Sequence, residues 1–202
     1  MNNSVLTAIG LIIIAYFFGS IPTGYILGKL IEGIDIREHG SGSTGATNVL
    51  RTLGKSAGAT VLLIDTLKGA IALLLVKGAY LYYPQNLPES WQPWLITTAG
   101  IAAIIGHSKS IWLQFTGGKS VATSLGVLLV MNPLVALSAL ASFALSIAVS
   151  RIVSLSSIIA AIAVVVAMIA LAQPLPYIIF AIFTSIYVIW RHRSNIQRLL
   201  QS

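Results

Sequence analysis

Long apolar runs alternate with short polar breaks along this chain of 202 residues. Most runs approach the roughly 20 residues with which an α-helix crosses the hydrocarbon core of a bilayer. The breaks are rich in Gly, Pro and Asn, where a helix does not continue. The pattern predicts an all-α integral membrane protein with about seven transmembrane helices: Val5–Gly28, Ala57–Tyr83, Trp91–Gly106, Val121–Met131, Leu134–Val149, Val153–Ala172 and Leu175–Trp190.

One predicted helix is too short to cross the membrane by itself. Val121–Met131 holds 11 residues, which at 1.5 Å per residue span roughly 16 Å of a core about 30 Å thick. Its amino end is therefore expected to start below the membrane surface, or the bilayer to thin around it. A recessed helix start, with free N–H groups and a positive dipole end, is suited to binding an anion.

Composition agrees with a lipid-embedded chain. Hydrophobic residues make up 56% of the sequence and charged residues only 8%, against about a quarter charged in soluble domains. No room is left for a separate soluble domain, so residues 1–202 are expected to form one transmembrane domain. The chain has no cysteine, which excludes disulfides and thiolate metal sites. Its first residues lack the positive charge of a secretory signal, so the first apolar run is expected to be a retained helix.

The positions of Lys and Arg predict the orientation, because basic residues are retained on the cytoplasmic side. The amino terminus and the alternate breaks near residues 83–93, 131–133 and 172–176 carry no basic residue, so we expect them outside. The other breaks and the carboxy terminus are expected in the cytoplasm. They contain all of the twelve basic residues except Lys68 and Lys77, which fall within the second helix. The net charge of +7 therefore needs no nucleic acid to explain it.

A first polar cluster on the predicted cytoplasmic face reads GSGSTGATN over residues 40–48, followed by Arg51. Its three glycines let the backbone turn and bring N–H groups close to a ligand. The hydroxyls of Ser41 and Thr47 and the amide of Asn48 add hydrogen-bond donors. Arg51 supplies a fork-shaped positive charge that fits a phosphate. The alternative is a flexible polar linker, which accounts for Gly and Ser but not for a dense set of donors ending in Arg.

A second cluster begins at His107 and continues through FTGGKSVAT, residues 115–123. Its Gly-Gly turn leads directly into the short helix, next to Lys119, so backbone N–H groups and a positive charge can meet one anion. The spacing of a nucleotide-binding P-loop would need glycine at position 113, where the chain has Leu113, and no strand precedes the loop. We therefore predict an anion site that does not bind ATP.

A third cluster joins Arg151 and Ser154 to the carboxy-terminal sequence RHRSNIQRL, residues 191–199. His192 and Asn195 are three residues apart and would share one face of a helix. The alternative is a basic anchor for anionic lipid, which explains the arginines but not His and Asn.

The remaining charged residues narrow the chemistry. Asp65 and Lys68 stand one helical turn apart in an apolar segment, which predicts a structural ion pair, although Lys68 could also lend its charge to the site from below. Three scattered histidines beside five acidic residues do not predict a metal site. No histidine is followed five positions later by Asp, so the His/Asp apparatus of the larger glycerolipid acyltransferase family is absent.

Together the three clusters resemble the signatures of the bacterial acyl-phosphate-dependent glycerol-3-phosphate acyltransferases, a seven-helix membrane family. The resemblance runs from end to end and includes LIDTLKG in the second helix. The chain departs from the family pattern at Ser43 in place of Asn, Ser110 in place of Pro and Ser120 in place of Gly. The resemblance implies that an acyl group passes from acyl phosphate to the C1 hydroxyl of glycerol 3-phosphate, without a covalent enzyme intermediate or a cofactor.

On this resemblance we expect the two phosphates to be neutralised by cations and N–H groups from the three clusters. Carboxylates are scarce, so the base is expected to be a substrate phosphate, with His192 or His107 as alternatives. The expected catalytic residues are Ser41, Arg51, Lys119, His192 and Asn195; the expected substrate-binding residues are Gly40, Gly42, Thr47, Asn48, Gly117, Gly118, Ser154, Lys68 and His107.

Two other functions remain open from the residues alone. A transporter or flippase for phosphorylated metabolites could also use a broken helix aimed at an anion, but the polar clusters gather on one face and no inverted repeat is visible. A non-catalytic scaffold with lipid-binding loops would not need the glycine-rich segments. The expected partners are acyl phosphate, glycerol 3-phosphate and the lipid bilayer of a bacterial inner membrane, with no nucleic acid, nucleotide or metal, and the expected state is a monomer.

Overall fold

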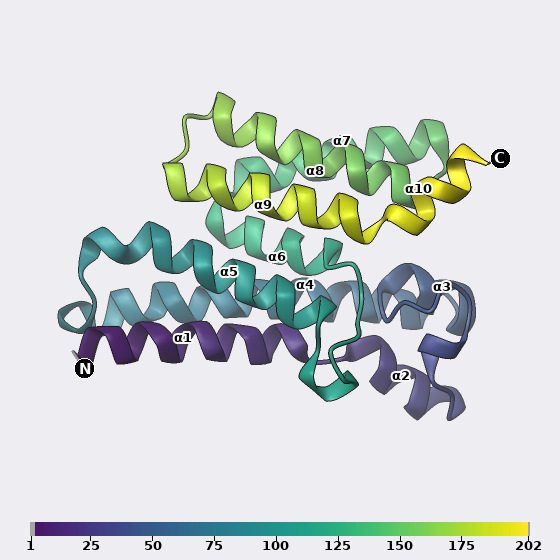
Figure 1. The fold of residues 1–202 in the computed structure, drawn as a ribbon, viewed down its shortest axis with the longest axis horizontal. Helices are drawn as coiled ribbons and strands as arrows, with labels where there is room; N and C mark the ends of the chain where they lie inside the picture. Colours follow the sequence, from purple (N-terminus) through teal and green to yellow (C-terminus); the bar gives the residue numbers. More distant parts are fainter. Residues whose placement is uncertain (1–2, 202) are drawn as a thin grey trace.

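The computed structural model describes residues 3–201, which form helices and turns but no β-strand. Long helices lie side by side, and short helices gather at one end of the bundle (Figure 1). The long helices are α1 (Asn3–Ser20), α4 (Lys55–Tyr82), α5 (Gln92–Ser108), α7 (Pro133–Ser150), α8 (Val153–Ala170) and α9 (Leu175–Arg191); the shorter α-helices are α2 (Thr23–Glu32), α3 (Ala46–Leu53), α6 (Val121–Met131) and α10 (Arg193–Leu200); and 3-10 turns cover Ile36–Glu38, Pro84–Asn86, Glu89–Trp91 and Ile111–Leu113.

Four helical segments of the described chain are long and apolar enough to cross a membrane: residues 3–32, which combine α1 and α2, together with α4, α7 and α8. The bent pair α9 and α10 adds a fifth if it is counted as one span. Helix α5 has 17 residues and α6 has 11. The prediction of an all-helical membrane protein is confirmed, and α6 begins and ends at the residues that the sequence predicted.

The first predicted helix, Val5–Gly28, is broken into two helices in the structure, although the two together form one candidate span, residues 3–32. The structure ends α1 at Ser20 and begins α2 at Thr23. Pro22 has no N–H to continue the helix, and its ring disfavours helical backbone in the preceding residue. The carbonyl oxygen of Ile21 instead accepts a hydrogen bond of 2.9 Å from Nζ of Lys68 on α4.

The core of the bundle is formed by apolar side chains from all the long helices and from α6. Leu73 on α4, Ile104 on α5, Val127 on α6 and Phe180 on α9 are all fully buried. Helices α4 and α6 approach so closely that a Cβ atom added to Gly126 would lie 1.8 Å from the carbonyl oxygen of Thr66. Small residues allow such contacts between membrane helices, and this contact fixes where α6 begins relative to α4.

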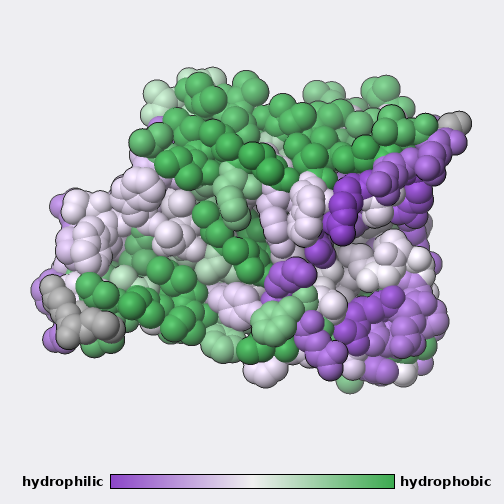
Figure 2. Space-filling model, in the orientation of Figure 1, coloured by the Kyte–Doolittle hydropathy of each residue, from purple (hydrophilic) through white to green (hydrophobic). Residues whose placement is uncertain are grey.

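Hydrophilic and hydrophobic residues are separated along the molecule. Figure 2 shows green hydrophobic surface over α1, α7, α8 and α9, and purple hydrophilic surface concentrated at the end where α2, α3 and α10 lie. The short helices that the sequence did not predict are therefore at the polar end of the bundle.

Candidate anion-binding site

The first cluster forms a compact loop around the side chain of Asn48, at the start of α3. The amide nitrogen of Asn48 donates to the carbonyl oxygens of Ile36, His39 and Ser43, at 3.1, 3.0 and 2.9 Å. Its amide oxygen accepts from the backbone N–H of Ser41 at 2.7 Å. Asn48 was expected to contact substrate, but the structure directs its amide into the loop's own backbone. Its role in the site is therefore to hold the loop that carries Ser41.

Gly40 is required by the same arrangement. It has a φ of 59°, in the left-handed region, and an added Cβ would lie 2.3 Å from Oδ1 of Asn48. Residues with side chains are disfavoured there by both torsion and space. The hydroxyl-bearing residues Ser41 and Ser43 and the backbone of Gly42 then line a pocket, whereas Thr47 and Arg51 lie on α3 and are not part of its lining.

The second cluster forms a tight turn that leads into α6. The N–H of Gly118 donates to the carbonyl oxygen of His107 at 3.3 Å. Nη2 of Arg191 donates to the carbonyl oxygens of Gly117 and Gly118, at 3.1 and 2.8 Å. Arg191 therefore ties the end of α9 to this turn. Ser120, where the family resemblance leads one to expect glycine, has a φ of 63°, a backbone conformation that glycine adopts without strain.

The third cluster is broken into two helices. Helices α9 and α10 meet at an angle of 55°, with His192 between them as the N-cap of α10. The carbonyl oxygen of His192 accepts from the N–H groups of Asn195 and Ile196, at 2.9 and 3.0 Å, so His192 and Asn195 stand one helical turn apart, as the sequence predicted. His192 is buried, and its Nδ1 lies 2.8 Å from the carbonyl oxygen of Val188. A carbonyl only accepts, so Nδ1 carries the proton and Nε2 keeps the lone pair in the neutral ring. The amide oxygen of Asn195 accepts a hydrogen bond from Nζ of Lys119.

A pocket of about 240 Å³ brings residues of the three clusters together. It lies at the hydrophilic end of the molecule (Figure 2). Three basic side chains line it, and none of the described residues that line it is acidic. Its lining residues are Ser41, Gly42, Ser43, Gly117, Lys119, Arg191, Arg193, Ser194 and Gln197.

Lys119 carries the largest electrostatic perturbation in the turn. Burial and, to a smaller extent, the positive charges of Arg198, Arg191 and Arg51 together lower its pKa to about 8. The influence of Arg51 shows that α3 also contributes positive potential to this pocket. A half-buried ammonium among arginines, bonded to a neutral amide oxygen, has no anion of its own. The pocket is therefore built to receive an anionic ligand.

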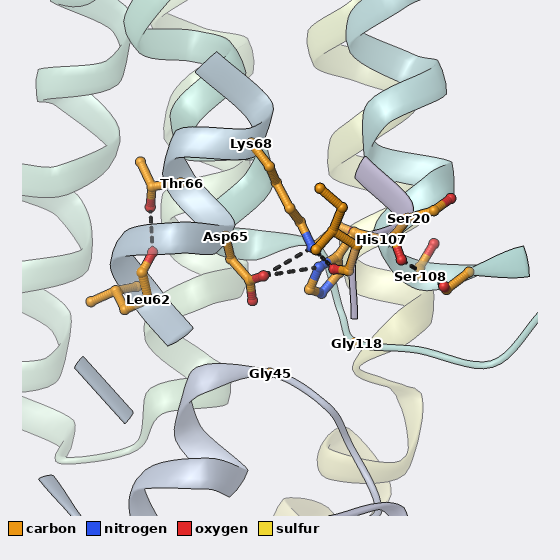
Figure 3. A network of polar contacts seen from close by, with 12 residues as sticks. Ser20, Gly45, Leu62, Asp65, Thr66, Lys68, His107, Ser108 and Gly118 are labelled. Atoms are coloured by element: carbon orange, nitrogen blue, oxygen red, sulfur yellow. Dashed lines mark hydrogen bonds and ion pairs between the residues drawn. The ribbon is translucent and has the colours of Figure 1, made fainter. Parts of the chain in front are cut away.

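A separate polar network lies beneath the turn, among α1, α4 and α5 (Figure 3). Nζ of Lys68 lies 2.9 Å from Oδ1 of Asp65, and Nδ1 of His107 lies 3.7 Å from the same oxygen. All three side chains are buried. The predicted ion pair of Asp65 and Lys68 is present. Lys68 and His107, however, were expected to bind substrate, and the structure places both outside the pocket lining.

The structure also shows site residues that the sequence analysis left out. Ser43, Arg191, Arg193, Ser194 and Gln197 line the pocket, and all belong to clusters that the sequence identified. Ser154, which was expected to bind substrate, lies half-buried in the first turn of α8 and is not part of the lining. Arg191 binds backbone carbonyls, which every residue type carries, so its contacts cannot be predicted from the sequence.

Comparisons with known proteins agree on one family. A family model described as glycerol-3-phosphate acyltransferase matches residues 9–202. A glycerol-3-phosphate acyltransferase of Rippkaea orientalis is 62% identical over 192 residues, covering 95% of this chain and 88% of the relative. One from Synechocystis is 56% identical over 203 residues, covering 100% of this chain and 91% of the relative.

Two solved structures share the fold. Both are of PlsY (YgiH), described as an integral membrane glycerol 3-phosphate acyltransferase, and both are 38% identical to this chain, covering 96% of it and 92% of their own chain. The glycerol 3-phosphate form has a TM-score of 0.87 and the lysophosphatidic acid form one of 0.84.

Proposed function

Because the chain belongs to the glycerol-3-phosphate acyltransferase family of integral membrane enzymes, we propose that its acyl donor is acyl phosphate and its product 1-acylglycerol 3-phosphate. The observation that carries the proposal is the pocket, which residues of three sequence-distant clusters line and in which the second and third clusters place Lys119, Arg191 and Arg193. Two phosphate-bearing substrates that react with each other need such a concentration of positive charge to offset their mutual repulsion.

The reaction is a direct displacement at the acyl carbon. The C1 hydroxyl of glycerol 3-phosphate forms a bond to the carbonyl carbon of the mixed anhydride, and the bond from that carbon to the phosphate oxygen breaks. The leaving group is inorganic phosphate, and the hydroxyl proton passes to a phosphate oxygen of a substrate. Nε2 of His192, whose lone pair is free in the neutral ring, is the alternative acceptor.

We assign roles to the site residues on their positions. Lys119, Arg51 and the Gly117–Gly118 turn neutralise phosphate, and Ser41 and Thr47 hold the donor phosphate or the carbonyl oxygen. Asn195, bonded to Lys119, orients glycerol 3-phosphate together with His192. Asn48, Lys68 and His107 support this arrangement from outside the pocket, as the contacts of their side chains indicate.

An acyl-transfer assay tests the donor. Purified protein in detergent is given labelled glycerol 3-phosphate with acyl phosphate, or with acyl-CoA as the control donor. We expect lysophosphatidate only with acyl phosphate. Product with acyl-CoA but not with acyl phosphate would overturn the proposed donor. If neither donor gave product, the proposed reaction would be wrong.

The pH dependence of the reaction is expected to follow Lys119, whose pKa is about 8 in the free protein. Above that pH the ammonium loses its proton and the pocket loses a positive charge, so kcat/KM should fall as pH rises through about 8. A bound phosphate favours the charged form and raises the pKa, so kcat should fall only at higher pH. Both quantities are measured from pH 6 to 10.

The matched control for this profile is Lys119→Arg, because a guanidinium stays charged throughout that range. Whatever the absolute activity of this variant, its kcat/KM should not fall as pH rises through about 8. A kcat/KM of the unmodified protein that stays constant from pH 7 to 9.5 would contradict the assignment of Lys119.

The proposal places the pocket in the cytoplasm, with the chain forming one domain of seven membrane crossings and α6 starting below the surface. The chain has no native cysteine, so single cysteines can report the side. Lys55 is the first residue of α4 and Gln85 follows its last turn, so Lys55→Cys and Gln85→Cys place exposed thiols at opposite ends of this helix. In intact bacterial cells with a permeable outer membrane, we expect a membrane-impermeant maleimide to label residue 85 but not residue 55. The reverse pattern would contradict the orientation.

A further inference from the structure

The connection between α5 and α6 exposes an unusual amount of apolar surface. We call residues 110–116 the aromatic loop. Ile111, Trp112 and Phe115 are 43%, 61% and 57% exposed, while Leu113 between them is buried. Surface loops in water are normally built of polar residues, and an apolar patch of this kind marks a contact surface.

The aromatic loop has a fixed shape. An isolated antiparallel bridge joins Ser110 to Thr116, and the N–H of Phe115 donates to the carbonyl oxygen of Ser110 at 2.8 Å. Oγ of Ser110 donates to the carbonyl oxygen of Ser20 at 2.6 Å, which anchors the loop to the end of α1. The exposed side chains are therefore presented by a closed and anchored backbone.

Phe115 is presented at a conformational cost. Its φ is 59°, in the left-handed region that a bulky side chain avoids. Asn or Gly would take this backbone conformation more easily. A strained aromatic residue facing water would gain nothing to offset that cost, whereas one in an apolar environment gains from burial.

The surface next to the aromatic loop faces lipid. The Trp112 ring lies 6.2 Å from the ring of Phe17 on α1. Ile13, Phe17 and Ile21, spaced four residues apart, are all exposed and form an apolar stripe along this membrane helix and its end. Figure 1 shows the teal connection between α5 and α6 folding back beside the junction of α1 and α2. The apolar surface of the loop thus continues the lipid-facing surface of α1.

We propose that the aromatic loop inserts into the boundary between headgroups and acyl chains of the bilayer, beside α1. Tryptophan is favoured at that depth because its ring is apolar and its N–H can reach polar groups. The exposed Lys109, directly before the loop, can extend to the headgroups.

Insertion would also set the depth of the active pocket. The loop ends at Thr116, directly before the Gly117–Lys119 turn, and Nη1 of Arg37 donates to Oγ1 of Thr116 at 3.1 Å. The bilayer would thereby hold the pocket at the level where the phosphate of a membrane-dissolved acyl donor lies. This consequence rests on the proposed function; the insertion itself does not.

The insertion is tested by the fluorescence of Trp112 alone. Trp91, Trp94 and Trp190 are replaced by Phe, and the protein is placed in vesicles of phosphatidylcholine brominated at shallow or deep acyl positions. We expect shallow bromines to reduce the emission to about half, and acrylamide to quench it only weakly. The control carries Lys55→Trp as its only tryptophan, with Phe at all four native positions, and should be quenched by acrylamide but not by bromolipid.

Emission of Trp112 that responds to acrylamide as the control does, and not to either bromolipid, would overturn the insertion.

The consequence for the pocket has its own test in the variant Trp112→Asn with Phe115→Asn, since Asn tolerates the left-handed backbone. In vesicles we expect its KM for acyl phosphate to rise about threefold or more with an unchanged KM for glycerol 3-phosphate. An unchanged KM for acyl phosphate would overturn the consequence, and failure of the acyl-transfer reaction itself would leave the fluorescence result standing.

Discussion

Replacing Lys119 by Met is expected to lower kcat/KM about 10²- to 10³-fold, the usual cost of removing one preorganised charge or donor from a transition state. Lys119 is half-buried in the pocket wall, and its ammonium is bonded to the amide of Asn195. Met keeps the length and flexibility of the side chain but offers no charge. The loss is measured by steady-state kinetics with acyl phosphate and glycerol 3-phosphate.

Lys119→Met should not lower the stability of the protein, although it lowers the activity. Burial and the nearby arginines lower the pKa of Lys119, which means that the folded protein disfavours the charged form of this residue relative to the unfolded chain. Removing the charge should leave the thermal unfolding temperature in detergent unchanged or higher. Loss of activity with retained stability separates a functional role from a structural one.

Lys55→Met is the matched control, because Lys55 is an exposed lysine at the start of α4 and does not line the pocket. Its activity should stay close to that of the unmodified protein. If Lys119→Met retained activity within a factor of about three, Lys119 would not be the cation that offsets the substrate phosphates.

The parts of the fold that the sequence predicted are those that depend on hydrophobic length and on strong breaks. Helix α6 was predicted residue by residue because a Gly-Gly turn precedes it and Asn132-Pro133 ends it; the side chain of Asn132 accepts from the N–H groups of Leu134 and Val135. The same reasoning failed at Pro22, where the apolar run continues across the break. A hydrophobic run predicts that a segment is surrounded by lipid, but it does not show that the helix breaks where proline removes one backbone hydrogen bond.

In the candidate site, too, the sequence predicted which segments meet but not the contacts between individual residues. The three clusters could be predicted to meet because polar residues on one membrane face have little space in which to separate. The particular contacts could not be predicted, since Asn48 and Arg191 bind backbone carbonyls that every residue type carries. Lys68 could be paired with Asp65 from spacing, but its bond to Ile21 spans 47 residues. Such contacts follow from tertiary packing and not from local pattern.

Close packing against His107, as well as hydrogen bonds, fixes the turn beside Lys119. A larger residue at Gly118 is therefore expected to lower activity strongly. A Cβ atom added to Gly118 would lie 2.1 Å from Nε2 of His107, in the polar network shown in Figure 3. The φ of Gly118 is not positive, so Ala is allowed by torsion and only the collision matters. The buried His107 cannot swing into solvent, and the turn must therefore shift.

Gly118→Ala is expected to lower kcat/KM about 10²-fold, because a displacement of about 1 Å in a positioned group has that effect, and to cost about 1–3 kcal/mol of stability through overpacking. Gly78→Ala on α4 is the control, since nothing lies within 4 Å of its added Cβ and Ala favours the helix. The decisive variant is Gly118→Ala with His107→Ala, which removes the colliding ring. If the collision is the cause, the double variant should be more stable than the sum of the two single effects predicts. Strict additivity, measured by thermal unfolding in detergent, would show that the ring of His107 does not support the turn.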